Sequence, residues 1–242
     1  MSEQLYHVSS SPHIRSRVTT ASIMRDVALA LMPSCLFSVY WFGLRALVVL
    51  AISVISCQAA ELLYFRLAGK KRTSFECSAI VTGLLLGMNF PSTIPLWIPV
   101  IGGFFAIIVV KELFGGLGNN FMNPALAARC FLLICFAGPM TSFSVKTTSS
   151  NFWLGAASVD GLSSATPLAV IKNAETSTDL PTLFDMFFGF TGGVIGETSI
   201  LFLLLGALYL LIRKVISLRI PLTYILSFAI FVLIANLVKT GT

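Results

Sequence analysis

The stretch of sequence that decides the fold lies at residues 46–67 and reads ALVVLAISVISCQAAELLYFRL. It has the length of about 20 residues that an α-helix needs to cross the hydrocarbon core of a bilayer. Its only charged residues are Glu61 and Arg66. We therefore expect a membrane-spanning helix at this position.

The composition of the whole chain extends this prediction. Of the 242 residues, 56% are hydrophobic and 11% are charged, and the mean hydropathy is +0.91. Because a soluble domain carries about 25% charged residues, a soluble globular domain is excluded. The abundant aromatic and β-branched residues also exclude a disordered chain. A background rich in Phe, Leu and Ile favours helices over a β-barrel, whose strands alternate apolar and polar residues. The predicted fold class is an all-α polytopic membrane protein.

Six other apolar segments flank the first one. They cover residues 27–42, 78–90, 96–110, 124–136, 189–212 and 220–238. Two of them are short, and short apolar segments occur as broken or re-entrant helices. We therefore predict about six to seven transmembrane helices in a chain with four regions. These are a cytoplasmic N-terminal arm (1–26), a first transmembrane bundle (27–138), a non-cytoplasmic loop (139–188) and further transmembrane helices (189–242).

The basic residues fall mainly on one side of this arrangement. If all seven segments span and the N-terminus is cytoplasmic, eleven of the 16 Lys and Arg residues lie on the cytoplasmic side and four on the other. This bias follows the positive-inside rule. The net charge of +6 is therefore explained by membrane topology and not by binding of nucleic acid. We predict a multi-pass protein of the inner cell membrane with its long polar loop outside the cytoplasm.

The first residues and the cysteines indicate no further site. Residues 1–22 are polar and basic and lack the apolar core of a secretory signal, so the first helix is expected to act as its own signal anchor. None of the five Cys residues forms a CxxC pair, which argues against a zinc site, and most lie in apolar runs, which argues against a disulfide framework. We predict no metal site and no catalytic residue in this chain.

The long loop contains a candidate modification site, the run DGLSSATPL that begins at Asp160. Asp, Gly, Ser and Pro cluster there as in a turn. The run also resembles the site at which flavin transferases attach FMN, through its phosphate, to a Thr or Ser hydroxyl. In that resemblance Asp160 is the acidic recognition residue and Thr166 is the acceptor. The small residues between them are Ser163, Ser164 and Ala165, and Ser164 stands where the usual residue is glycine.

Four other stretches resemble two related protein families. They read TGLLLGMNFP (82–91), KELFGGLGNNFMNPAL (111–126), AARCFL (127–132) and GGVIGETS (192–199). One family is RnfD, which belongs to the Rnf complex, a membrane ferredoxin:NAD oxidoreductase. The other is NqrB, which belongs to the sodium-pumping NADH:quinone oxidoreductase. The resemblance spans nearly the whole chain and is closer to RnfD, because NqrB has a longer N-terminal extension.

This resemblance implies a flavin-carrying subunit of a redox-driven Na⁺ or H⁺ pump. The chain would then be part of a translocase without holding a complete active site. The implied cofactors are FMN, bound covalently at Thr166, and riboflavin, bound non-covalently. The implied partners are the iron–sulfur and flavin subunits of the complex, a flavin transferase and membrane lipid. The family fold implies inverted helical repeats similar to urea transporters, and relative to that family the chain is shortened at its C-terminus.

Residues outside the loop supply further candidates. Residues 115–124 contain three Gly, three Asn and a Pro, so this backbone cannot stay helical and can line a cavity. The resemblance implies that a second flavin binds near this segment. Its candidate binding residues, which lie in and after the segment, are Gly116, Asn120, Asn123 and Arg129. Ionisable residues inside apolar segments are functional candidates because their burial is costly. On this ground Glu61 and Glu197 are predicted to act on an ion or to make structural hydrogen bonds.

Two alternatives remain open at this point. The first is the quinone-reducing relative, which requires a quinone site. The second belongs to another class, a non-redox channel of the urea-transporter type without flavin. Such a channel has no reason to display the run from Asp160 to Thr166 outside the cytoplasm.

Overall fold

The computed structural model describes residues 19–69, 77–143, 182–190, 192–197 and 199–240. These residues form helices and connecting segments without any strand, which confirms the predicted all-α fold for this part of the chain. The elements are α1 (Thr20–Phe42), α2 (Leu44–Leu67), α3 (Ser78–Met88), α4 (Trp97–Phe104), the π-helix η1 (Phe105–Glu112), α5 (Pro124–Cys135), α6 (Ala137–Thr141), α8 (Leu183–Phe188), α9 (Ile200–Ile212) and α10 (Arg219–Thr240).

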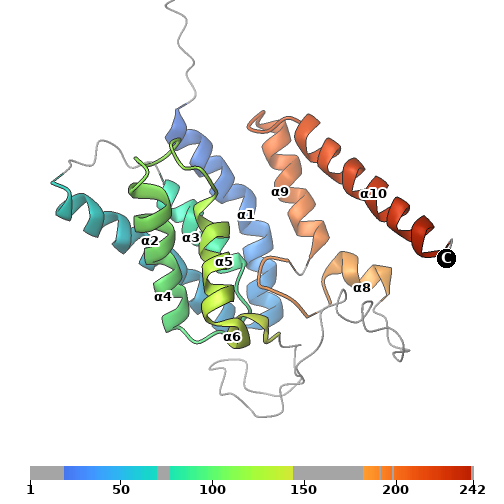
Figure 1. Cartoon of the computed structure of the whole chain (residues 1–242), viewed down its shortest axis with the longest axis horizontal. Helices are drawn as coiled ribbons and strands as arrows, with labels where there is room; N and C mark the ends of the chain where they lie inside the picture. Colours follow the sequence, from blue (N-terminus) through green and yellow to red (C-terminus); the bar gives the residue numbers. More distant parts are fainter. Residues whose placement is uncertain (1–18, 70–76, 144–181, 191, 198, 241–242) are drawn as a thin grey trace, which may run out of the picture.

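Three helices are long and apolar enough to cross a membrane: α1, α2 and the part of α10 at Arg219–Leu237. The helices α3, α5 and α9 are also apolar but shorter. Figure 1 shows α1 in the middle of the molecule, with α2 to α6 on one side and α9 on the other. Contacts of α1 with α2, α3 and α9 agree with this view. The helix α10 lies at the outer edge, and its residues 219–237 are exposed.

The first two helices meet at a single glycine. Gly43 ends α1 and precedes α2 with φ 80° and ψ −168°, a conformation that residues with a Cβ rarely adopt. The helix α1 starts earlier than the expected residue 27, because Thr19 caps it. The Thr19 hydroxyl oxygen accepts a hydrogen bond from the Ser22 backbone N–H at 3.3 Å, which satisfies a backbone donor of the first turn.

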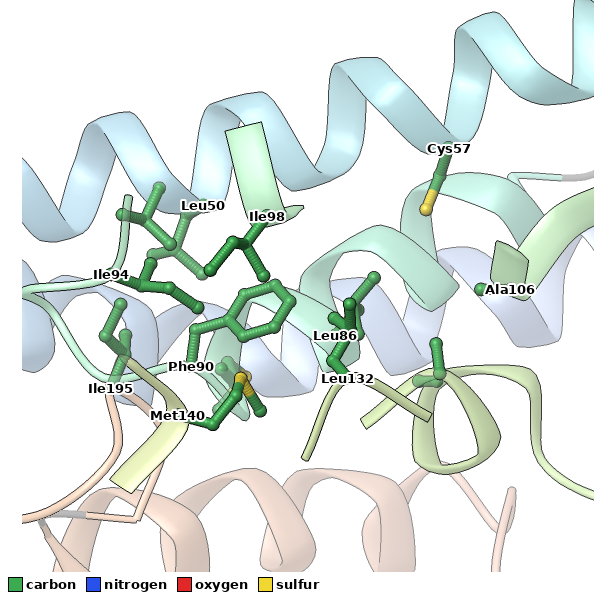
Figure 2. Close-up of a cluster of buried hydrophobic side chains, with 14 of the residues drawn as sticks. Leu50, Cys57, Leu86, Phe90, Ile94, Ile98, Ala106, Leu132, Met140 and Ile195 are labelled. Atoms are coloured by element: carbon green, nitrogen blue, oxygen red, sulfur yellow. The ribbon is translucent and has the colours of Figure 1, made fainter. Parts of the chain in front are cut away.

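The core lies between α2, α3, α4 and α5. Figure 2 shows the Phe90 ring at its centre, surrounded by Ile94, Ile98, Leu86 and Met140. Of these side chains, Phe90, Leu86, Ile94 and Ile98 are fully buried. Because lipid tails are as apolar as these side chains, the cluster stabilises the bundle mainly through close packing.

Two non-helical segments meet inside the bundle. One follows α3 and contains Phe90, and the other precedes α9 and contains Ile195. Their backbones are joined, because Ile195 N–H donates to the Phe90 carbonyl at 2.9 Å and Gly196 N–H donates to the Met88 carbonyl at 2.7 Å. From α1, the Ser38 hydroxyl donates to the Ile195 carbonyl. These bonds satisfy backbone groups that a helix would otherwise satisfy, as the interior of a membrane protein requires.

This arrangement corrects one of the predicted helices. The apolar segment at 189–212 was expected to be helical from residue 189, but α9 begins only at Ile200. Gly189 has φ 95° and ends the short helix α8, and the backbone N–H groups of residues 195 and 196 bond instead to the carbonyl groups of Phe90 and of Met88, the last residue of α3. Tertiary hydrogen bonds therefore replace the helix that the apolar composition predicted.

A side chain of arginine stabilises the other non-helical segment. Arg45 Nε donates to the Ser92 carbonyl at 2.9 Å, and Arg45 Nη2 lies 3.2 Å from the carbonyl oxygens of both Thr93 and Ile94. Three carbonyl groups beyond the end of α3 thus receive donors from one side chain of α2.

Glycine permits the close approach of α2 and α3. A Cβ added at Gly83 would lie 2.6 Å from Val54 Cα and 2.9 Å from the Ser53 carbonyl oxygen. Both atoms belong to the backbone of α2 and cannot move aside without displacing the helix. Small residues of this kind bring transmembrane helices into contact.

We therefore expect Gly83→Ala to lower the free energy of unfolding by about 1–3 kcal/mol, the usual cost of overpacking. The matched control is Gly193→Ala, where an added Cβ meets no atom within 4 Å. The control is expected to change stability by about 0.5 kcal/mol or less. Thermal unfolding of both variants in detergent tests this. Equal midpoints for the two variants would contradict the packing explanation.

Candidate functional site

The residues predicted to carry FMN lie outside the described residues. Asp160, Ser163, Ser164, Ala165 and Thr166 all fall within residues 144–181, which the structure does not describe. Their predicted roles therefore stay predictions. The remaining candidates, together with residues that the sequence analysis missed, lie in the described part of the chain.

The Gly-rich segment after η1 leaves the helical conformation as predicted. Gly115, Gly116 and Gly118 have φ values of 106°, 86° and 93°, which glycine adopts at little cost. The Gly116 N–H donates to the Lys111 carbonyl at 3.0 Å, so this first turn is tied back to the end of η1. The segment connects η1 to α5.

Asn120 and Asn123 differ in what their side chains do. Asn123 Oδ1 accepts a hydrogen bond from the Ala125 N–H at 3.0 Å. Asn123 thus caps α5, with Pro124 as the first helical residue, a typical helix start. Asn120 Oδ1 is buried and has no hydrogen-bond partner among the described residues. Since a buried acceptor without a donor is costly, Asn120 fits a ligand that brings an N–H or O–H group.

Arg129 projects from α5 toward the end of α3. Its Nη1 donates to Asn89 Oδ1 at 2.7 Å, and Asn89 Nδ2 donates to the Leu85 carbonyl at 2.7 Å. No carboxylate of the described residues forms an ion pair with Arg129. The guanidinium is half-buried and has no acidic partner among the described residues, so its remaining N–H groups can donate to a polar group of a ligand.

Glu61 lies in a buried cluster of polar and charged groups. Lys111 Nζ donates to Glu61 Oε1 at 2.6 Å and to Ser78 Oγ at 2.7 Å. The same ammonium lies 3.4 Å from Glu112 Oε1. The cluster joins α2, α3 and η1, and all four residues are buried. We call these four residues the Lys111 cluster.

Three members of the Lys111 cluster were missed in the sequence analysis. Lys111 was counted only as a topological charge, and Ser78 and Glu112 were not singled out. The sequence does contain a signal, because Lys111 and Glu112 are adjacent charged residues directly after the apolar run 96–110. Their burial depends on contacts with Glu61, 50 positions earlier, which a single sequence does not display.

The π-helix η1 accounts for the burial of two adjacent charged residues. In this element the Leu113 N–H donates to the Ile108 carbonyl at 3.0 Å, a bond from residue i to residue i−5. The wider turn brings Lys111 and Glu112 inside together, at 3% and 6% exposure. Short π-helical segments are rare in proteins, and those that do occur are frequently found at functional sites.

A second charged contact joins α1 to α9. Arg213 Nη2 lies 3.1 Å from Asp26 Oδ2, and the Tyr209 hydroxyl lies 3.3 Å from Asp26 Oδ1. Asp26 is buried, whereas half of the Arg213 side chain is exposed. This contact holds the two helices together at one end and involves none of the predicted site residues.

Glu197 lies in a different environment from the one predicted. It was expected just inside the sixth transmembrane helix, but it lies in the turn before α9 and is exposed. Its N–H donates to the Val194 carbonyl at 3.2 Å. The early end of α8 and the late start of α9 explain this position, which lies outside the Lys111 cluster.

Comparison with known proteins adds a relationship to this geometry. A model of the NQR2, RnfD, RnfE family matches residues 7–242. The chain is 48% identical over 238 residues to the D subunit of the Na(+)-translocating ferredoxin:NAD(+) oxidoreductase complex of Acetobacterium woodii, a match that covers 98% of this chain and 71% of that protein. It is 37% identical over 230 residues to the D subunit of the proton-translocating ferredoxin:NAD(+) oxidoreductase complex of Clostridium ljungdahlii, covering 92% of this chain and 67% of that protein. It is 36% identical over 233 residues to the D subunit of the ion-translocating oxidoreductase complex of Rhodobacter capsulatus, covering 88% of this chain and 65% of that protein.

Proposed function

Because the chain belongs to the NQR2, RnfD, RnfE family, we propose that it is the D subunit of an ion-translocating ferredoxin:NAD⁺ oxidoreductase complex. The observation that carries this proposal is the 48% identity over 98% of the chain to a protein with that name. The names of the relatives favour this function over the quinone-reducing relative. The other Rnf subunits, which include iron–sulfur and flavin subunits, are then its partners, and the reaction is completed only in the complex.

In this function the chain holds flavin and passes electrons between partner subunits. FMN is attached to the Thr166 hydroxyl through its phosphate by a flavin transferase. Asp160 and the residues Ser163, Ser164 and Ala165 form the recognition element. The flavin supplies the redox chemistry, and the protein positions it and sets its surroundings.

A second flavin, riboflavin, is bound non-covalently near residues 115–129. The unpartnered buried oxygen of Asn120 and the half-buried guanidinium of Arg129 support this placement, because both groups are available to a polar ligand. Gly116 allows the backbone to turn without a side chain in the way. Asn123 contributes by capping α5, so that its role is to hold the segment in place.

The membrane arrangement that we propose has six to seven transmembrane helices in inverted repeats similar to urea transporters. The N-terminus is cytoplasmic and the loop with Thr166 lies on the other side. Two observations support it: the bias of basic residues, and the backbone hydrogen bonds between the non-helical segments before α9 and after α3. Short helices interrupted by non-helical segments are typical of transporters built from inverted repeats.

Flavin fluorescence after denaturing gel electrophoresis tests the proposal. The unmodified chain, produced in cells that contain the flavin transferase, is expected to give a fluorescent band. Thr166→Ala is expected to abolish the band, because no acceptor hydroxyl remains, whereas the control Thr178→Ala in the same loop is expected to keep it.

Two outcomes would contradict the covalent flavin. A dark band for the unmodified chain would exclude covalent attachment of FMN. Fluorescence that persists in Thr166→Ala would show that FMN is attached to another residue.

A further inference from the structure

The side-chain amide of Asn89 joins the end of α3 to α5. Its Nδ2 donates to the Leu85 carbonyl at 2.7 Å, and its Oδ1 accepts from Arg129 Nη1 at 2.7 Å. The reverse orientation of the amide would set its NH₂ group against a guanidinium that can only donate. The bond to Leu85 therefore keeps the amide oxygen turned toward Arg129, and Asn89 fixes the position of a side chain 40 positions later in the chain.

The backbone on both sides of Asn89 is held by the segment before α9. The Met88 carbonyl accepts from the Gly196 N–H at 2.7 Å, and the Phe90 carbonyl accepts from the Ile195 N–H at 2.9 Å. A polar side chain on a backbone that is fixed in this way is suited to hold another side chain in one geometry. Asn89 is thus a rigid support for the Arg129 guanidinium.

The end of α3 does not itself require Arg129. The carbonyl groups of its last four residues, Leu85–Met88, each accept a hydrogen bond from the Asn89 side chain, from the N–H groups of Asn89 and Phe90, or from the Gly196 N–H. Of the five N–H donors of a guanidinium, one bonds to Asn89, and the others have no acceptor among the described residues. Because a charged residue inside an apolar segment is costly, these unused donors indicate that Arg129 binds a ligand.

The chemistry of the free groups is complementary to a flavin ring. Asn120 Oδ1 is buried without a donor, and Arg129 lacks acceptors for its remaining N–H groups. The isoalloxazine ring offers both, since it carries an N–H group and carbonyl oxygens. On reduction the ring takes up two electrons and one proton and so gains one negative charge. A positive charge beside the ring stabilises this reduced form, which raises the reduction potential.

We propose that Asn89 is a positioning residue that directs the Arg129 guanidinium toward the non-covalent flavin and thereby raises the reduction potential of that flavin. Asn89 acts only through Arg129 and does not touch the ring. The inference rests on the proposed function, because it requires the second flavin near residues 115–129. It adds to that site a residue of another helix.

The full chain with the substitution Thr166→Ala, purified in detergent, tests the proposal, because any flavin that it retains is non-covalent. Asn89→Asp keeps an oxygen for Arg129 but adds a negative charge that pairs with the guanidinium. The reduction potential, measured by spectroelectrochemical titration, is therefore expected to shift to a more negative value. The control Lys214→Asn changes the net charge by the same amount at an exposed position and is expected to leave the potential unchanged.

A double-mutant cycle separates positioning from a structural role. Asn89→Leu removes both hydrogen bonds and is expected to lower the potential, whereas Asn89→Gln, which keeps an amide, is expected to recover part of the loss. In the background of Arg129→Gln, Asn89→Leu is expected to have no further effect, because Asn89 acts through the guanidinium.

Three outcomes would overturn the proposal. Equal shifts for Asn89→Leu with and without Arg129 would show that Asn89 acts independently of the guanidinium. An unchanged potential in Asn89→Asp would show that the charge of Arg129 does not reach the flavin. Failure of Asn89→Asp and Asn89→Gln to fold would give Asn89 a purely structural role.

The flavin content separates this result from that of the proposed function. Riboflavin is extracted from the Thr166→Ala chain and quantified by chromatography. A chain without riboflavin would exclude the second flavin and with it the role of Asn89. A chain that retains riboflavin, with a potential that the Asn89 variants do not change, would support the second flavin and reject only the role of Asn89.

Discussion

Replacement of Glu61 by alanine is expected to lower the free energy of unfolding by about 3 kcal/mol, because it removes the nearest carboxylate from the buried Lys111 ammonium. Loss of one partner of a buried ion pair costs about 3–5 kcal/mol, since the remaining charge is left uncompensated. The lower end of that range applies here because Glu112 Oε1 remains 3.4 Å from Lys111 Nζ. The measurement is unfolding of the purified protein in detergent, followed by the loss of helical circular dichroism.

The matched control is Glu197→Ala, because Glu197 is exposed in the turn before α9. A surface substitution of this kind changes stability by about 0.5 kcal/mol or less. Equal losses of stability in the two alanine variants would show that the pair between Glu61 and Lys111 contributes nothing to the fold.

Phe90→Ala is expected to cost about 3 kcal/mol through the cavity that it leaves in the core. Phe90 is fully buried, and its ring lies at the centre of the cluster in Figure 2. Removal of a buried phenylalanine costs about 3–5 kcal/mol in soluble proteins, the sum of a transfer term and a cavity term. In a bilayer the transfer term is small, because lipid tails are as apolar as the side chain, so the cavity term dominates.

The same substitution on α10 separates packing from composition. Phe231 is 71% exposed, and Phe231→Ala is expected to change stability by about 0.5 kcal/mol or less. Thermal unfolding in detergent compares the two variants directly. A midpoint for Phe90→Ala as high as that of Phe231→Ala would mean that the core repacks around the missing ring.

Hydrophobicity and length were sufficient to predict the long helices. Residues 46–67 were expected to form a helix, and α2 covers Leu44–Leu67. The helix α10 likewise covers the apolar segment at 220–238. These predictions depend only on local composition, since a long apolar segment in a bilayer must satisfy its own backbone groups.

Composition failed where tertiary contacts decide the conformation. The apolar residues before α9 were expected to be helical, but the Ile195 and Gly196 N–H groups bond to carbonyl groups at the end of α3 and just after it. Such bonds join positions far apart in the chain and leave no periodic pattern in the sequence. The predicted start of the sixth helix was therefore wrong, and Glu197 was placed in a helix where the structure has a turn.

The candidate site was predictable only in part, for the same reason. Glu61 was predicted as a candidate residue because an acidic residue inside an apolar segment is unusual, and the structure does place it in a buried cluster. Lys111 lies at the end of an apolar segment, where basic residues usually face the membrane surface. Only the π-helical turn of η1 and the position of α2 bring it to Glu61.

The contact between α1 and the non-helical segment before α9 also sets an order of events during protein synthesis. On α1, the Ser34 hydroxyl donates to the Gly196 carbonyl, 162 positions later in the chain. At a synthesis rate of about 5–20 residues per second, on the order of ten seconds or more separates the two partners. During that interval the first helices must remain in the membrane with this polar contact unmade. The early bundle therefore acquires its final packing only after the later half of the chain has been inserted.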